Sequence, residues 1–162
     1  MVRKGHFLLL LLGALLGSPL AAATVSFMVV ETGLPVEAGA NQYSGLWESG
    51  LLDVFFEAGH IVSNAPVLRL YEKSMEEFPE EAREELNGAV EGGAEYFILA
   101  MLDYDAANLQ KPRNISLRLF RTNPYKKLYE QQYADQASRT LKDEYDNLKK
   151  VARGLVSHLN DR

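Results

Sequence analysis

Few residues of this chain have the types and spacing that chemistry requires. Asp103 and Asp105 follow the most apolar segment of the sequence, and carboxylate oxygens are ligands that a divalent cation prefers. However, the glycine-containing pattern of a calcium loop is absent, and acids at the end of a strand usually only hydrate a turn. Asp53 and Glu57 lie one helical turn apart, but acid–base catalysis needs a desolvated carboxyl group and their side of the predicted helix is polar. We therefore predict no metal site and no catalytic carboxylate pair.

Histidine chemistry is equally sparse. Beyond residue 23 the sequence contains only His60 and His158, whereas a zinc site needs three or four ligands. Ser63, His60 and an acid could form a hydrolase triad, but no glycine-flanked nucleophile motif surrounds any serine. A small hydrolase remains an alternative that requires a deep pocket with His60 and a serine or an acid in reach. The leading expectation is a protein that is not an enzyme and uses no cofactor.

Two aromatic residues form a first candidate interface. Tyr43 and Trp47, the only tryptophan, lie four residues apart near the start of a predicted helix, and both residue types are enriched at binding hot spots. Trp47 also borders the apolar stripe of that helix, so packing in the core is the simpler explanation. Together with Tyr104, the two rings could instead provide stacking platforms for a sugar. A small-ligand or cell-wall glycan binding module is therefore an alternative function.

A predicted hairpin supplies the second candidate interface. Its candidate residues are Arg118, Phe120, Tyr129, Gln131 and Tyr133. If this hairpin forms the edge of a sheet, its outer strand can accept a strand from another protein. Ordinary side-chain pairing across the hairpin explains the same residues without a partner.

The spacing of apolar residues predicts the elements that must position these side chains. Helical spacing indicates helices at 46–58 after an N-cap at Ser44, at 79–91, and at 141–156. Strands are predicted at 25–30, 61–62, 96–102, 115–119 and 128–133, with loops at 36–43 and 103–114. Residues 67–78 fit either a continued strand or a linking segment with a short helix. The order β-α-β-α-β-β-β-α predicts an α/β (α+β) fold, in which about three amphipathic helices pack on one face of a single mixed sheet.

The first 23 residues predict export. Arg3 and Lys4 precede an apolar run from Phe7 to Leu16, and the small residues 21–23 follow, which is the pattern of a secretory signal peptide. Cleavage after Ala23 would leave residues 24–162 as one domain. The apolar run is about ten residues long, well short of the roughly 20 that span a bilayer as a helix. We therefore expect a periplasmic or secreted protein without stable membrane insertion.

Charge and cysteine content limit the partners. Removal of residues 1–23 would leave 15 basic and 22 acidic residues, and such an acidic chain would be repelled by nucleic acid. The sequence has no cysteine, which removes a disulfide framework, a thiol nucleophile and a lipid-carrying amino-terminal cysteine.

Several segments resemble small α/β domains of bacterial envelope proteins. These domains are the amino-terminal domain of the translocation protein TolB, the periplasmic domain of the curli secretion channel lipoprotein, and the penicillin-binding-protein activator LpoB. The matching segments are 25–30, 46–58 with 61–62, 93–99, 115–133 and the closing helix. The chain lacks the lipidation cysteine of the lipoproteins and the propeller of TolB, so their particular partners do not carry over. The resemblance implies a non-enzymatic interaction or assembly domain of the cell envelope, with another envelope protein as its partner.

Overall fold

The computed structural model describes residues 22–35, 41–70, 78–105, 108–134 and 140–159. Residues 1–21 of the predicted signal peptide lie outside these ranges. The described strands are β1 (Thr24–Thr32), β2 (Ile61–Asn64), β3 (Leu68–Leu70), β4 (Tyr96–Asp105), β5 (Asn108–Thr122) and β6 (Tyr125–Ala134). The helices are α2 (Gln42–Glu57), α3 (Arg83–Glu91) and α4 (Leu141–Leu159), and the 3-10 turn η2 (Glu80–Ala82) precedes α3. The predicted α/β fold class and element order are confirmed.

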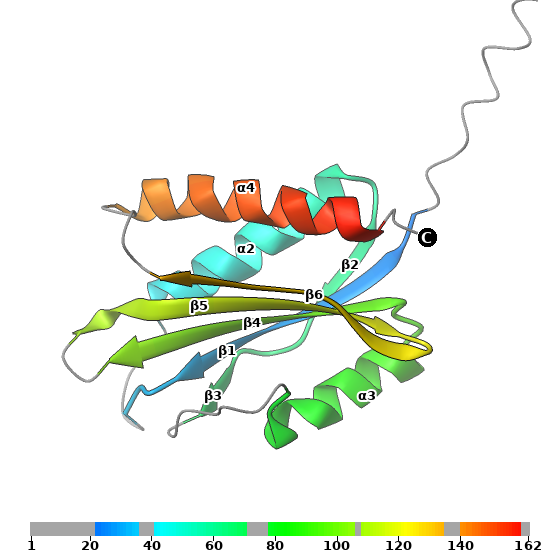
Figure 1. The fold of residues 1–162 in the computed structure, drawn as a ribbon, viewed down its shortest axis with the longest axis horizontal. Coiled ribbons are helices and arrows are strands. Elements are labelled where there is room, and N and C mark those ends of the chain that lie inside the picture. Colours follow the sequence, from blue (N-terminus) through cyan, green and yellow to red (C-terminus); the bar gives the residue numbers. More distant parts are fainter. Residues whose placement is uncertain (1–21, 36–40, 71–77, 106–107, 135–139, 160–162) are drawn as a thin grey trace, which may run out of the picture.

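One mixed sheet forms the centre of the molecule (Figure 1). Its strand order is β2-β1-β4-β5-β6, and β3 also pairs with β1. β1 runs parallel to β2, β3 and β4, whereas β4, β5 and β6 form an antiparallel meander. β1 and β4 therefore lie inside the sheet, which explains why their sequences are apolar at almost every position.

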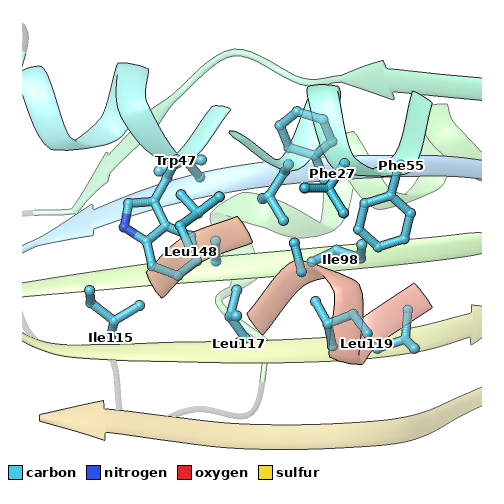
Figure 2. Packing of buried hydrophobic residues seen from close by; sticks show 14 of the residues in the cluster. Phe27, Trp47, Phe55, Ile98, Ile115, Leu117, Leu119 and Leu148 are labelled. Carbon is cyan, nitrogen blue, oxygen red and sulfur yellow. The ribbon is translucent and has the colours of Figure 1, made fainter. Parts of the chain in front are cut away.

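The helices cover both faces of the sheet, which corrects the expectation that all of them pack on one face. α2 and α4 lie on one face and α3 on the other (Figure 1). The first face carries the larger core, which includes Phe27, Ile98 and Leu117 (Figure 2). Met28 and Leu99 point to the second face, where Leu86 of α3 packs against their cluster. The reason is topological: the two crossovers β1–α2–β2 and β3–α3–β4 run in opposite directions along the sheet, and right-handed connections then place their helices on opposite faces.

The segment predicted as a loop at 103–114 is mostly strand. β4 continues to Asp105 and β5 begins at Asn108. The β4–β5 register shifts between Asp103 and Tyr104 and again between Tyr104 and Asp105. Such irregular pairing accommodates the polar residues and Pro112 that suggested a loop.

The N-cap of α2 also differs from the expectation. It is Asn41, whose side-chain oxygen accepts a hydrogen bond from the Tyr43 amide at 2.9 Å. Ser44 lies inside the first turn of the helix, and its hydroxyl donates a hydrogen bond to the carboxylate of Glu31.

Ala23, the last residue before the predicted cleavage point, packs in the core of the described structure. Ala23 is buried, and its amide donates to Nδ1 of His60 at 3.2 Å while its carbonyl accepts from the Ile61 amide at 3.0 Å. Among the helices in the described ranges, none combines the length and apolar character of a membrane span.

Candidate functional site

The sheet ends at β6, as the hairpin hypothesis requires. β6 pairs with β5 from Ala134 opposite Asn114 to Tyr125 opposite Thr122, and no other described strand pairs with it. A register shift between Leu119 and Phe120 makes a bulge in this pairing. β6 is therefore a ten-residue edge strand whose outer side is not paired within the described part of the chain.

Three of the candidate residues form a row on the β6 face that α4 covers. We call Tyr129, Gln131 and Tyr133 the tyrosine row, because they pair opposite the core residues Leu119, Leu117 and Ile115. The Tyr129 ring lies 4.5 Å from the ring of His158 in α4, measured between centroids, and its hydroxyl donates to the Gln131 side-chain oxygen. Both tyrosines are half-buried, whereas Gln131 is exposed. Burial, followed by the neighbouring Tyr129, raises the pKa of Tyr133.

Arg118 belongs to a partly buried ion pair on the opposite face of the hairpin. It is 8% exposed, and its Nε lies 3.0 Å from Oε1 of Glu130 on β6. Lys127 binds the other carboxylate oxygen at 2.7 Å, and this hydrogen bond is the largest cause that lowers the pKa of Glu130. Arg118 thus joins β5 to β6 and does not project outward as the hairpin hypothesis assumed.

Phe120 is also a core residue. It is fully buried, and its ring lies between those of Phe78 at 5.4 Å and Tyr125 at 5.5 Å. Its prediction as a surface contact must be corrected, because the face of β5 that carries it is the face that packs toward α3.

The proposed surface patch around Tyr43 and Trp47 is not formed. Tyr43 is 3% and Trp47 is 2% exposed, and the indole Nε1 of Trp47 donates to Oε1 of Glu144 at 3.1 Å. Figure 2 shows Trp47 beside Leu148 of α4. Tyr104, the third ring of the suggested sugar platform, is fully buried. These aromatic residues join α2, α4 and the sheet and cannot stack on a ligand at the surface.

A polar cluster at the carboxyl ends of the parallel strands was not predicted from the sequence. This carboxyl-end cluster consists of Glu31, Ser44, Arg69 and Tyr104. The Glu31 side chain is fully buried, and Arg69 Nη2 and Nε lie 2.6 Å and 2.8 Å from its Oε2. Burial and then the nearby Glu31 raise the pKa of Tyr104. The signal in the sequence is that Glu31 directly continues the apolar strand, where a carboxylate needs a buried partner.

A pocket of about 440 Å³ adjoins this cluster and is lined by Glu31, Ser44, Glu48 and Arg69, among others. In open α/β sheets, ligands bind outside the carboxyl ends of the strands. The Glu31 carboxylate in this pocket is already engaged by Arg69 and Ser44. The geometry therefore supports a role in joining β1, β3 and α2.

The groups considered for catalysis are engaged in local contacts. Nδ1 of His60 accepts the Ala23 amide, and burial lowers the pKa of His60, while Ser63 is exposed. Asp103 accepts a hydrogen bond from the Thr32 hydroxyl at 3.2 Å, and Asp105 forms an ion pair with Arg113 at 3.1 Å. In the ranges that the structure describes, no three histidine, cysteine or acidic side chains are grouped to hold a metal ion.

The remaining acids of interest lie on α2. Asp53 accepts a hydrogen bond from the Tyr145 hydroxyl at 2.6 Å, and Glu57 lies 3.8 Å from Lys149. Both carboxylates therefore link α2 to α4 at the exposed surface.

Comparison with known proteins gives structural matches of low identity. No curated protein matches the chain at a significant level. A dodecamer of a PelC variant from Paraburkholderia phytofirmans matches with a TM-score of 0.48 and 10% identity, covering 85% of this chain and 89% of the other. A second PelC dodecamer from that organism has a TM-score of 0.45 and 14% identity, with coverages of 87% and 89%.

TolB from Acinetobacter baumannii matches with a TM-score of 0.38 and 11% identity over 86% of this chain. The match spans only 29% of that TolB chain. TolB, one of the three proteins resembled in sequence pattern, is thus among the structural matches, whereas the other two resemblances stay predictions. A family model described as "Uncharacterised protein" matches residues 24–140, and the chain belongs to this family.

Proposed function

We propose that this chain is an exported, non-enzymatic interaction domain of the cell envelope, which binds an extended strand of another envelope protein along the outer side of β6. The observation that carries the proposal is the position of β6 at the end of the sheet, with its outer side unpaired by any described strand. The backbone amides and carbonyls of such an edge can pair with a further strand.

The side chains around this edge favour binding of a partner strand along the carboxyl-terminal half of β6. Lys126, Lys127 and the adjacent bulge lie near the amino end of β6, and lysines and bulges are the devices by which proteins protect an edge. The tyrosine row follows them. Tyr129 and Tyr133 are held against the α4 side of the sheet, so they lose little conformational freedom when a partner binds. A partner strand would therefore pair with residues 128–133.

The non-enzymatic part of the proposal rests on how the candidate reacting groups are engaged. Asp53 accepts a hydrogen bond from the Tyr145 hydroxyl, and the carboxylate of Glu31 is neutralised by Arg69. Arg118 is likewise paired with Glu130. These contacts hold elements of the fold together.

Site-specific crosslinking tests the proposal. A photoreactive amino acid is placed at Gln132, which is exposed on β6, and the protein is irradiated in cells that export it. The expected result is one discrete adduct with a partner protein. When positions 130, 131 and 132 are probed in turn, the residues of the partner that become crosslinked should alternate between the two faces of its strand, because successive residues of a strand face opposite sides. The matched control carries the same group at Lys150, which is exposed on α4.

A variant that prevents strand pairing at the β6 edge completes the test. Gln131→Lys with Gln132→Lys adds protecting lysines at two exposed positions and should abolish the adduct while the protein stays folded. An adduct that survives this change, or that forms equally from Lys150, would contradict the proposed site. Turnover of a substrate by the purified protein would contradict the non-enzymatic assignment.

A further inference from the structure

The larger core is incompletely covered where it reaches the β6 edge of the sheet. Tyr129 and Tyr133 of β6 and Val151 of α4 pack against this core, but all three are only partly buried. No described strand lies beyond β6 to complete their cover. We call these three residues the core margin, because they present aromatic and aliphatic surface at the border of the core.

The helix α4 extends the core margin along the length of β6. The ring of His158 lies 4.5 Å from that of Tyr129, measured between centroids. Val151 lies about two helical turns before His158 and thus on the same flank of α4. Because α4 runs antiparallel to β6 (Figure 1), Val151 lies toward the end of β6 that carries Tyr133. The apolar surface therefore follows one side of the edge strand.

The opposite face of β6 has a different character. Glu130 and Gln132 pair opposite Arg118 and Ser116, and both are exposed. The carboxylate of Glu130 is bound by Arg118 and Lys127, so its charge is balanced within the hairpin. One face of the edge strand is thus aromatic and half-buried, whereas the other face is polar and hydrated.

We propose that the partner strand is amphipathic, with two apolar side chains that contact the core margin and polar side chains on its other face. This inference rests on the strand addition proposed above and specifies the kind of strand that fits the site. An added strand would alternate its side chains in phase with those of β6, because neighbouring strands share the pleat of a sheet.

The spacing of the two tyrosines sets the spacing of the apolar anchors in the partner. Residues next to Tyr129 and Tyr133 lie four positions apart and on the side of the sheet that α4 covers. Pairs of aromatic and β-branched residues across neighbouring strands are favourable. Valine, isoleucine or an aromatic residue therefore fits at both anchor positions.

Mapping of crosslinked residues tests this inference. A photoreactive amino acid at Gln131, which lies between the two tyrosines on the same face, should capture a partner residue that has apolar residues two positions before and two positions after it. The same group at Gln132 should capture a residue of the polar face. A polar residue at either flanking position would overturn the inference, although the adducts would still support strand addition. Absence of an adduct from both positions would contradict strand addition itself.

Substitutions in the core margin give a second measurement. Tyr133→Ser should lower the yield of the Gln132 adduct at least about threefold, because it removes a ring that contacts one apolar anchor, whereas Tyr133→Phe should retain the adduct. Val151→Thr keeps the shape of the side chain and should lower the yield in the same direction.

The matched control is Tyr125→Ser, which removes a tyrosine from the other half of β6 and should leave the yield unchanged. Thermal melting monitored by circular dichroism establishes that each variant is folded. An unchanged yield in both Tyr133→Ser and Val151→Thr would overturn the proposal. An equal loss in Tyr125→Ser and Tyr133→Ser would also overturn it.

Discussion

The carboxyl-end cluster and the β6 edge both concentrate polar side chains at the border of the same sheet, but they use them in opposite ways. In the cluster, Glu31 is fully buried and its oxygens are engaged by Arg69 and Ser44. At the edge, Gln131 and Gln132 are exposed, and no described strand pairs with the outer side of β6. The Glu31 carboxylate of the first region is already engaged inside the fold, whereas the second region offers a strand template.

The carboxyl-end cluster therefore serves the stability of the fold, whereas we propose that the β6 edge serves recognition. A buried, paired carboxylate is costly to disturb, because removing its partner leaves an uncompensated charge. Exposed side chains on an edge strand can change with little effect on folding. Substitutions in the two regions should therefore differ most clearly in their effect on the free energy of unfolding.

The largest effect is expected from Arg69→Ala. This change leaves the buried Glu31 carboxylate without its counter-charge and should lower the free energy of unfolding by about 3–5 kcal/mol, measured by urea denaturation. Glu31→Leu combined with Arg69→Met should recover most of this loss, since apolar residues of similar size can replace a buried ion pair.

The control is Arg113→Ala, which removes an exposed ion pair with Asp105. Their side chains are 65% and 41% exposed, so the change should cost no more than about 1 kcal/mol. If Arg69→Ala and Arg113→Ala lowered the free energy of unfolding equally, the distinction between the buried cluster and the surface would be contradicted.

The Trp47→Phe variant tests whether Trp47 stabilises the fold through its buried hydrogen bond to Glu144. The phenyl ring keeps most of the packing but leaves the buried Glu144 carboxylate without the indole donor, which should cost about 1–3 kcal/mol of unfolding free energy. The partner crosslink from Gln132 should be retained. A variant that unfolds normally but no longer forms this crosslink would restore Trp47 as an interface residue.

The pH dependence of stability tests the effect of burying His60. Burial lowers the pKa of His60 below its ordinary value of 6.5, so between these two pKa values the unfolded chain binds more protons than the native chain. The His60 contribution is therefore complete above pH 6.5 and is lost as the pH falls toward the lowered pKa. Denaturation curves should show this loss, and His60→Gln should reduce it. Unchanged pH dependence in the variant would show that His60 is not its source.

The smallest effect is expected at the edge itself. Gln131→Lys with Gln132→Lys should change the free energy of unfolding by no more than about 0.5 kcal/mol per site, because both side chains are exposed. Thermal melting monitored by circular dichroism provides the measurement. A large destabilisation would mean that these residues support the fold and would weaken the contrast with Glu31.

The local elements were predictable from the sequence because they depend on local periodicity. The apolar stripe of α4 and the buried pattern of β4 identified both elements. The face occupied by α3 depends on the direction of its crossover, which no local pattern contains. The continuation of β4 to Asp105 was missed for a similar reason, since pairing with β5 overrides the loop preference of its polar residues.

The candidate site was predictable only in part. The hairpin hypothesis named Tyr129, Gln131 and Tyr133 as candidate contacts, and the structure puts their strand at the edge of the sheet. Phe120 was a candidate surface contact, whereas core packing was the simpler explanation of Trp47 and is confirmed. The burial of both residues depends on α4 and on the α3 side of the sheet. The Glu31–Arg69 pair joins residues 38 positions apart in sequence, and such contacts follow only from the assembled sheet.

Amide hydrogen exchange of the protein bound to its crosslink-identified partner tests strand addition at β6 most directly. We predict slower exchange at alternate amides of residues 128–133, which face outward from the sheet, and unchanged exchange at the opposite edge strand β2, residues 61–64. Unchanged exchange along β6, or protection of β2 instead, would contradict the central claim that β6 accepts a partner strand.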